Sequence, residues 1–151
     1  MNVAIHDTVS PRGTLHYRVY KYKTDGSREL IEDVTDHNLV VNAGRNLLAR
    51  LVCGDTTEHV TQIGVGVASA AAQLSDTLTD QWKLFALTSH EVDGNNVIFH
   101  WHLTRQQANN MDITEFALVS NADVMMTHQV RGRVIGKEAD LEIEGTYTLH
   151  F

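Results

Sequence analysis

The sequence predicts a mainly β protein, namely an antiparallel β-sandwich with jelly-roll-like connections and one short α-helix. Seven or eight short segments carry strand-like patterns and are separated by turn residues. Only one segment has convincing helical periodicity, whereas an α/β fold needs a helix between successive strands. With 151 residues the chain suits a single domain.

Period-2 alternation and turn residues mark the strands. The expected strands are residues 15–23, 28–34, 60–67, 82–92, 97–104, 113–120, 125–133 and 141–151, and the short segment 38–41 leads into the helix. The Asp25-Gly26 step favours a tight hairpin turn between the first two of these. In residues 97–104 one face is apolar and consists of Val97, Phe99, Trp101 and Leu103. In the last strand Leu141, Ile143, Tyr147, Leu149 and Phe151 alternate with Glu142, Glu144, Thr146, Thr148 and His150.

The predicted helix spans residues 42–54, with its body at 43–53. Asn42 is expected to cap the first turn with its side chain, and Gly54 suits the left-handed conformation that ends a helix. One face of the helix is apolar and consists of Leu47, Leu48, Leu51 and Val52. Because a helix of about three turns is marginal alone, we expect this face to dock on the sheet.

Composition narrows the class of protein. The net charge of −7 and the lack of a basic stripe argue against a nucleic-acid partner. No apolar run is long enough to span a membrane, and the N-terminus lacks the pattern of a signal peptide. The single cysteine, Cys53, is expected to be a buried, inert thiol. Residues 1–13 are predicted to form a flexible arm, and residues 14–151 a single domain.

The common catalytic motifs are missing. The chain contains no GxxxxGK[ST], HExxH or GxSxG. Gly64-Val65-Gly66 lacks the third spaced glycine of a dinucleotide loop and is not followed by a convincing helix. Asp112 and Glu115 offer a formal acid/base pair, but a solvated or structural role fits their surroundings in the sequence better. We therefore predict no catalytic residues, no cofactor and no enzymatic activity.

Two binding alternatives remain. His100 and His102 point to the same face of a strand, so they are the candidate metal ligands if His90 or His150 supplies a third. Surface or interface histidines give the same pattern, and no metal site is predicted. The set Tyr17, Tyr20, Tyr22, Trp82 and Trp101 offers sugar-stacking surfaces, although Tyr17 and Trp101 fall at expected core positions.

The order of several segments resembles small structural proteins and modules of tailed-phage virions. The segments are LVVNAGRNLLARLVCGD, VTQIGVGVAS, LSDTLTD, VIFHWHLTRQQANNMDITEFALVS and LEIEGTYTLHF. In that group a strand enters a short N-A-G-R helix, and a glycine-containing strand follows. An acidic, threonine-rich loop comes next, and an I-x-E-F/x-x-L strand precedes the terminal strand. The resemblance covers roughly residues 38–151.

The resemblance implies a non-catalytic virion subunit, made in the host cytoplasm, with no nucleic-acid or membrane partner. The subunit would be a head decoration or cement protein, or a small tail or baseplate component, and we favour the head slightly. Its partners would be capsid, tail or baseplate subunits, with a homodimer or homotrimer expected. The contact regions expected are residues 1–13 and the loop 68–81. The alternatives are a carbohydrate-binding host-recognition module and, less favoured, a metal-dependent enzyme using His100 and His102.

Overall fold

The computed structural model describes residues 11–151, so residues 1–10 of the expected arm lie outside the described part. This part contains nine strands and one helix. The elements are β1 (Arg12–Tyr22), β2 (Arg28–Val40), α1 (Asn42–Val52), β3 (Val60–Gly66), β4 (Lys83–Ala86), β5 (Ser89–Asp93), β6 (Asn96–Leu103), β7 (Met111–Ser120), β8 (Thr127–Lys137) and β9 (Leu141–His150). The predicted class, mainly β with one short helix, is confirmed.

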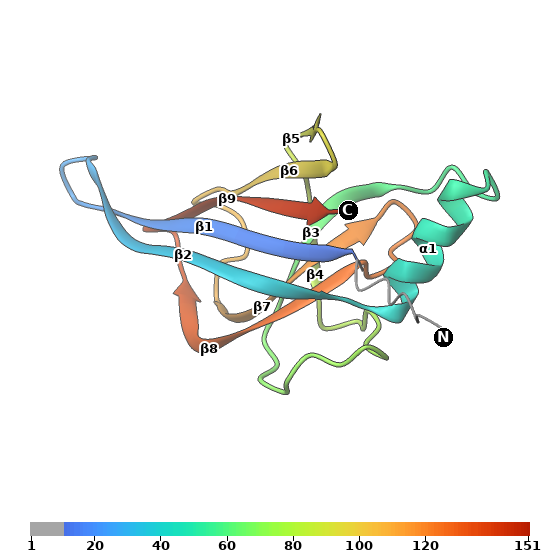
Figure 1. Ribbon diagram of the computed structural model, residues 1–151. Helices are drawn as coiled ribbons and strands as arrows, with labels where there is room; N and C mark the ends of the chain where they lie inside the picture. The colour runs from blue at the N-terminus through green and yellow to red at the C-terminus, as the bar shows by residue number, and fades with distance from the viewer. Residues whose placement is uncertain (1–10) are drawn as a thin grey trace, which may run out of the picture.

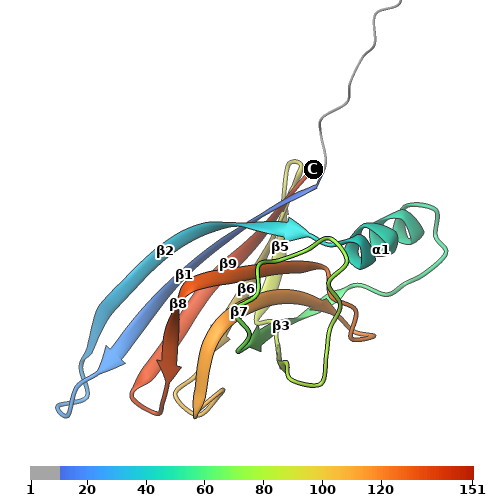
Figure 2. The same cartoon turned by 90° about the horizontal axis from the view of Figure 1, so that it is seen from below.

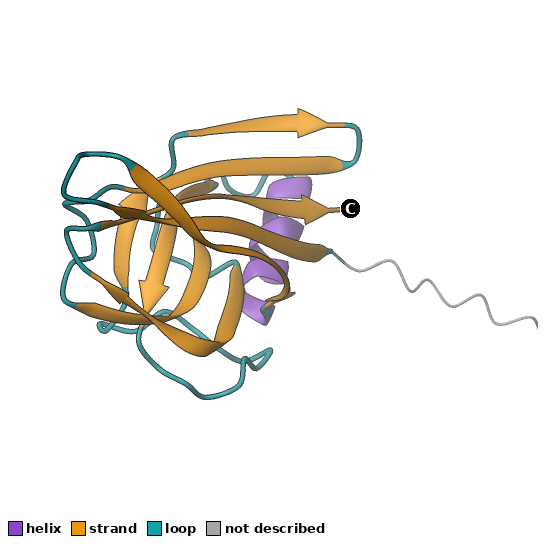
Figure 3. Cartoon of the chain, turned by 90° about the vertical axis from the view of Figure 1, so that its left-hand side faces the viewer, coloured by secondary structure: helices purple, strands orange, loops and turns teal. Residues whose placement is uncertain are grey.

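The strands form one curled antiparallel sheet in the order β4-β3-β7-β8-β2-β1-β9-β6-β5. The sheet folds over into two layers, one of β2-β1-β9-β6-β5 and one of β4-β3-β7-β8 (Figures 1 and 3). β2 and β8 join the layers through only two residue pairs, Leu39 with His128 and Val40 with Thr127. The result is a β-sandwich-like fold, as the alternating segments predict.

Several strand boundaries differ from the expectation, and the last strand but one, β8, runs to Lys137 rather than Arg133. The single strand expected at 82–92 is two strands, because the chain crosses between layers at Leu87 and Thr88. The Leu87 N–H donates to Thr61 in the four-stranded layer, and the Thr88 N–H donates to His100 in the five-stranded layer. The segments expected at 28–34 and 38–41 are one strand, β2. β1 begins at Arg12, so the last two residues of the expected arm belong to the sheet.

The two ends of α1 differ in how well they were predicted. The N-cap is Val41, without a side-chain bond, so the predicted capping by Asn42 is wrong. The Asn42 N–H instead donates to the Leu74 carbonyl, and this bond serves the helix start. At the C-terminal end Gly54 has φ +76° and the Asp55 N–H donates to the Arg50 carbonyl, which confirms the predicted left-handed ending.

The apolar face of α1 is shorter than predicted. Leu47 is buried, and Leu48 and Leu51 pack partly against the main core. Val52 is 89% exposed and Cys53 is also exposed, so the predicted burial of both side chains is wrong. The helix crosses one end of the sandwich (Figure 1). Its last turn lies past the ends of the strands, where the sheet does not cover it.

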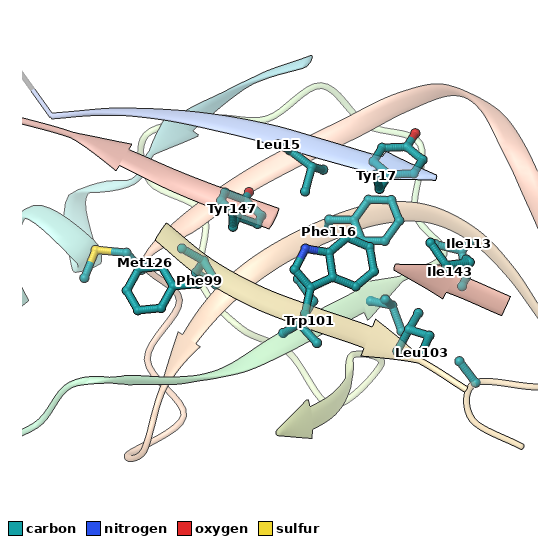
Figure 4. Packing of buried hydrophobic residues seen from close by; sticks show 14 of the residues in the cluster. Leu15, Tyr17, Phe99, Trp101, Leu103, Ile113, Phe116, Met126, Ile143 and Tyr147 are labelled. Atoms are coloured by element: carbon teal, nitrogen blue, oxygen red, sulfur yellow. The ribbon is translucent and has the colours of Figure 1, made fainter. Parts of the chain in front are cut away.

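The main core is centred on three aromatic rings. Tyr17, Trp101 and Phe116 are all buried, and their ring centroids lie 5.1–6.3 Å apart (Figure 4). Tyr17 and Trp101 come from strands on either side of β9, and Gly145 lies opposite both. A Cβ atom at Gly145 would lie 2.7 Å from the Trp101 ring, so only glycine leaves room for it. The core positions predicted for Tyr17 and Trp101 are confirmed.

Candidate functional site

Residues 67–82 form a long loop without regular secondary structure that covers the outer face of the four-stranded layer. Figure 2 shows the loop, in green, crossing β7 and β8. Leu78 and Trp82 face inward and pack on a second core cluster formed by Val41, Ala117, Val119 and Met125. β7 is therefore buried on both faces, which explains the unbroken apolar run Phe116 to Val119.

Backbone bonds hold the loop at two points. The Ala68 N–H donates to Glu115 Oε2 at 2.8 Å, and the Thr114 hydroxyl donates to the Ala68 carbonyl. At its middle the Leu74 carbonyl accepts the Asn42 N–H at 2.8 Å. The loop is thus attached to β7 and to the start of α1.

A buried histidine makes the third attachment. His128 Nδ1 lies 2.7 Å from Asp76 Oδ2, and Nε2 lies 2.9 Å from Glu115 Oε1. The side chains of His128 and Glu115 are only 7% and 6% exposed. The Trp82 ring packs edge-on against the imidazole with centroids 5.4 Å apart. We call Asp76, His128 and Glu115 the clamp, because they join the loop, β8 and β7.

The clamp holds Asp76 in its charged form. Burial alone would raise its pKa, but the bonds from the Gln73 N–H and His128 outweigh burial and hold the pKa of Asp76 below its ordinary value. An imidazolium can donate from both ring nitrogens, so it matches two carboxylates placed on opposite sides.

The glycine-spaced strand β3 makes room for this arrangement. A Cβ atom at Gly64 would lie 3.2 Å from both the Trp82 ring and Leu84. A Cβ atom at Gly66 would lie 2.3 Å from Glu115 Oε2. Both glycines lie inside β3 rather than in a strand-to-helix turn, so their role is to admit the loop and its anchor.

The candidate metal pair lies on the outer face of the five-stranded layer, and each ring has its own carboxylate. His100 Nε2 is 3.0 Å from Glu91 Oε1, and His102 Nε2 is 3.1 Å from Glu142 Oε2. His90 is opposite Phe99 and therefore on the other face of the sheet. His150 is bonded to Thr14 and Asn96.

These pairings leave the metal pair without the third ligand it requires. Within residues 11–151, no three His, Cys, Asp or Glu side chains are grouped to hold a metal ion.

The carboxylates named from the sequence have separate surroundings. Burial alone would raise the pKa of Glu142, but bonds from Arg28 and His102 hold it below its ordinary value. Glu144 lines an open groove of about 400 Å³ together with His16 and His100. Asp112 is exposed, whereas Glu115 is buried in the clamp, so the two do not form a pair.

The aromatic side chains proposed for sugar stacking are engaged elsewhere. Tyr17 and Trp101 are in the core, and Trp82 packs on His128. The guanidinium of Arg28 lies 3.9 Å from the centre of the Tyr20 ring, and that of Arg105 lies 4.2 Å from the centre of the Tyr22 ring. Core packing, His128 or a guanidinium thus covers at least one face of each of the five rings.

Sequence reasoning missed Asp76 and His128 as site residues. They are 52 positions apart, and no short motif joins them. One available signal was Glu115, a carboxylate directly before the apolar run of β7, because a buried carboxylate needs a partner that neutralises it.

Comparison of the chain with protein-family models, curated proteins and solved structures finds no match. The one helix in the described part of the chain, α1, is not long and apolar enough to cross a membrane.

Proposed function

We propose that this protein is a non-enzymatic structural subunit of a tailed-phage virion. It binds neighbouring virion proteins as a head decoration or cement protein or as a small tail or baseplate component. Of these two locations we slightly favour the head. The order of segments between residues 38 and 151 supports this assignment. A β-sandwich-like fold with an attached surface loop suits such a role.

The observation that carries a binding role is the loop 67–82. Long irregular loops in compact domains are commonly functional. This loop is attached at three separate points, whereas Val67, Ala70, Ala71 and Leu74 remain exposed. A surface that is already ordered loses less conformational entropy when it meets a partner. The loop therefore offers small apolar side chains on a fixed backbone.

Such a subunit works by adding modest contacts. A stable pairwise interface buries about 1,200–2,000 Å² in total, and the loop is proposed as one part of such a surface. Repeated contacts with several capsid, tail or baseplate subunits, or within a homodimer or homotrimer, raise the overall affinity through multivalency. Residues 1–10 are proposed as a second contact.

The experiment is incorporation of purified protein into particles that lack it, measured per particle by quantitative mass spectrometry. Leu74→Glu places a charge on the loop and should reduce incorporation about tenfold or more, as expected for a side chain worth at least 1.4 kcal/mol. Val134→Glu is the matched control, because Val134 is an apolar residue on β8 that is 54% exposed, against 44% for Leu74. Equal incorporation of the two variants would refute the loop proposal, and cryo-EM of the particle would distinguish head from tail.

The arm is tested by a deletion that spares the sheet. Arg12 and Gly13 pair with β9, so the deletion should end at Ser10 rather than Gly13. The shortened protein should keep the unfolding temperature of the full chain but fail to enter particles. Normal incorporation would eliminate the arm as a contact.

A further inference from the structure

We propose that the clamp makes docking of the loop 67–82 depend on protons: the loop is docked while the clamp holds two protons and is released when one is lost. A role for this proton dependence in partner binding rests on the proposed function of the loop as a contact surface. The proton dependence of loop docking itself is a property of the purified protein alone.

The proton count follows from the two hydrogen bonds. Each ring nitrogen of His128 lies within 2.9 Å of a carboxylate oxygen, so each contact requires one hydrogen between nitrogen and oxygen. A doubly protonated ring between two carboxylates satisfies this, and so does a neutral ring with a protonated Glu115. Both states contain two protons.

Loss of one proton leaves one contact without a hydrogen. A neutral imidazole has one donor nitrogen and one acceptor nitrogen, so its lone pair then faces a carboxylate oxygen. Glu115 and His128 are almost fully buried, and water cannot replace the missing bond without movement. The movable partner is the loop, because Asp76 belongs to it and Glu115 also binds the Ala68 N–H.

No neighbouring group takes over the role of His128. From the loop, Asp80 lines a pocket that the three clamp residues also line, and it adds negative charge there. From β2, Asp36 and His37 line a second groove that His128 also lines, and Asp36 accepts a hydrogen bond from the Gln129 side chain. Arg131 of β8 also lines that groove, but it is committed to Tyr17 and Glu32. His128 is the one basic side chain bonded to the described clamp carboxylates.

The test combines two measurements on the full chain between pH 5 and pH 9. The ¹⁵N shifts of the His128 ring report its protons, and amide hydrogen exchange, corrected for intrinsic pH dependence, reports loop docking. The Ala68 and Asn42 amides are the reporters, because they donate to Glu115 and to Leu74 of the loop. The Leu118 amide, bonded to Thr127 in the core, is the internal control.

We expect protection of Ala68 and Asn42 to fall about tenfold or more as the ring changes its protonation, which is the effect of losing one charged hydrogen bond. Protection of Leu118 should not change. In His128→Gln the loop amides should show no such transition, whereas the matched control His37→Gln should keep it.

Loss of the ring proton without a change in Ala68 protection in the wild-type chain would overturn the proposal. A transition that persists in His128→Gln would also overturn it. The measurement on the wild-type chain tests the proposal even if His128→Gln does not fold. Failure of Leu74→Glu to affect particle incorporation would count against the contact role and leave this result unaffected.

Discussion

The carboxylate of Glu115 occupies the space that a side chain at Gly66 would fill. A Cβ atom there would lie 2.3 Å from Glu115 Oε2, the oxygen that accepts the Ala68 N–H. The other oxygen of the same carboxylate bonds His128. A missing side chain on β3 thus determines where the anchor on β7 lies, and through it where the loop begins.

Gly66→Ala should displace Glu115 and lower the free energy of unfolding by about 1–3 kcal/mol, the usual cost of forcing atoms into a packed site. Urea denaturation measures this change, and faster exchange of the Ala68 amide should accompany it. Gly132→Ala is the control, because a Cβ atom at Gly132 meets nothing within 4 Å. Equal effects of the two substitutions would mean that the close approach at Gly66 does not affect the free energy of unfolding.

Phe116→Ala should lower the free energy of unfolding by about 3–5 kcal/mol, because it opens a cavity where the Tyr17 and Trp101 rings meet. Phe151→Ala removes the same side chain at a position that is 45% exposed, and should change stability by less than about 0.5 kcal/mol. Chemical denaturation of both variants distinguishes the sites. A small effect at Phe116 would contradict the aromatic centre of the core.

Asp76 should stabilise the fold at neutral pH and lose this effect in acid. Its pKa is lower in the folded chain than its ordinary value of about 3.9, so the stabilisation is complete above that value and disappears as pH falls through the folded pKa. Denaturation from pH 6 to pH 2 should show a shallower loss of stability for Asp76→Asn than for the wild type. Asp112→Asn, at an exposed aspartate of β7, should follow the wild-type curve. Coincident curves for all three proteins would refute this role.

Cys53 should react with a thiol reagent in the native protein, because it is exposed after the last turn of α1. Absorbance after addition of Ellman's reagent should report one thiol per native chain. The buried-thiol control is Cys53→Ser combined with Ala117→Cys, which should react only after unfolding. A native Cys53 that stays unreactive would support the burial predicted from the sequence.

Local patterns were sufficient for most elements. The alternation in β6 and β9 and the Asp-Gly turn before β2 are properties of a few adjacent residues, so the strands were placed correctly. The predicted helix end at Gly54 is also local, since a left-handed φ favours glycine in any context. The errors arose where a distant segment decides the outcome. The Asn42 N–H is bonded to a loop 32 residues later, and the expected strand at 82–92 divides because its two halves join different layers.

The sequence by itself determined a mainly β chain, one short helix, two outward-facing histidines on β6 and a glycine-spaced strand. These follow from side-chain periodicity and backbone preferences, which act over a few residues. Only the tertiary structure decided that Gly64 and Gly66 admit Trp82 and Glu115, and that Asp76, His128 and Glu115 form one clamp. The physical reason is that burial and charge pairing depend on distance in space. The clamp residues come from two strands that pair with each other, β7 and β8, and from a loop distant in sequence that folds over their outer face.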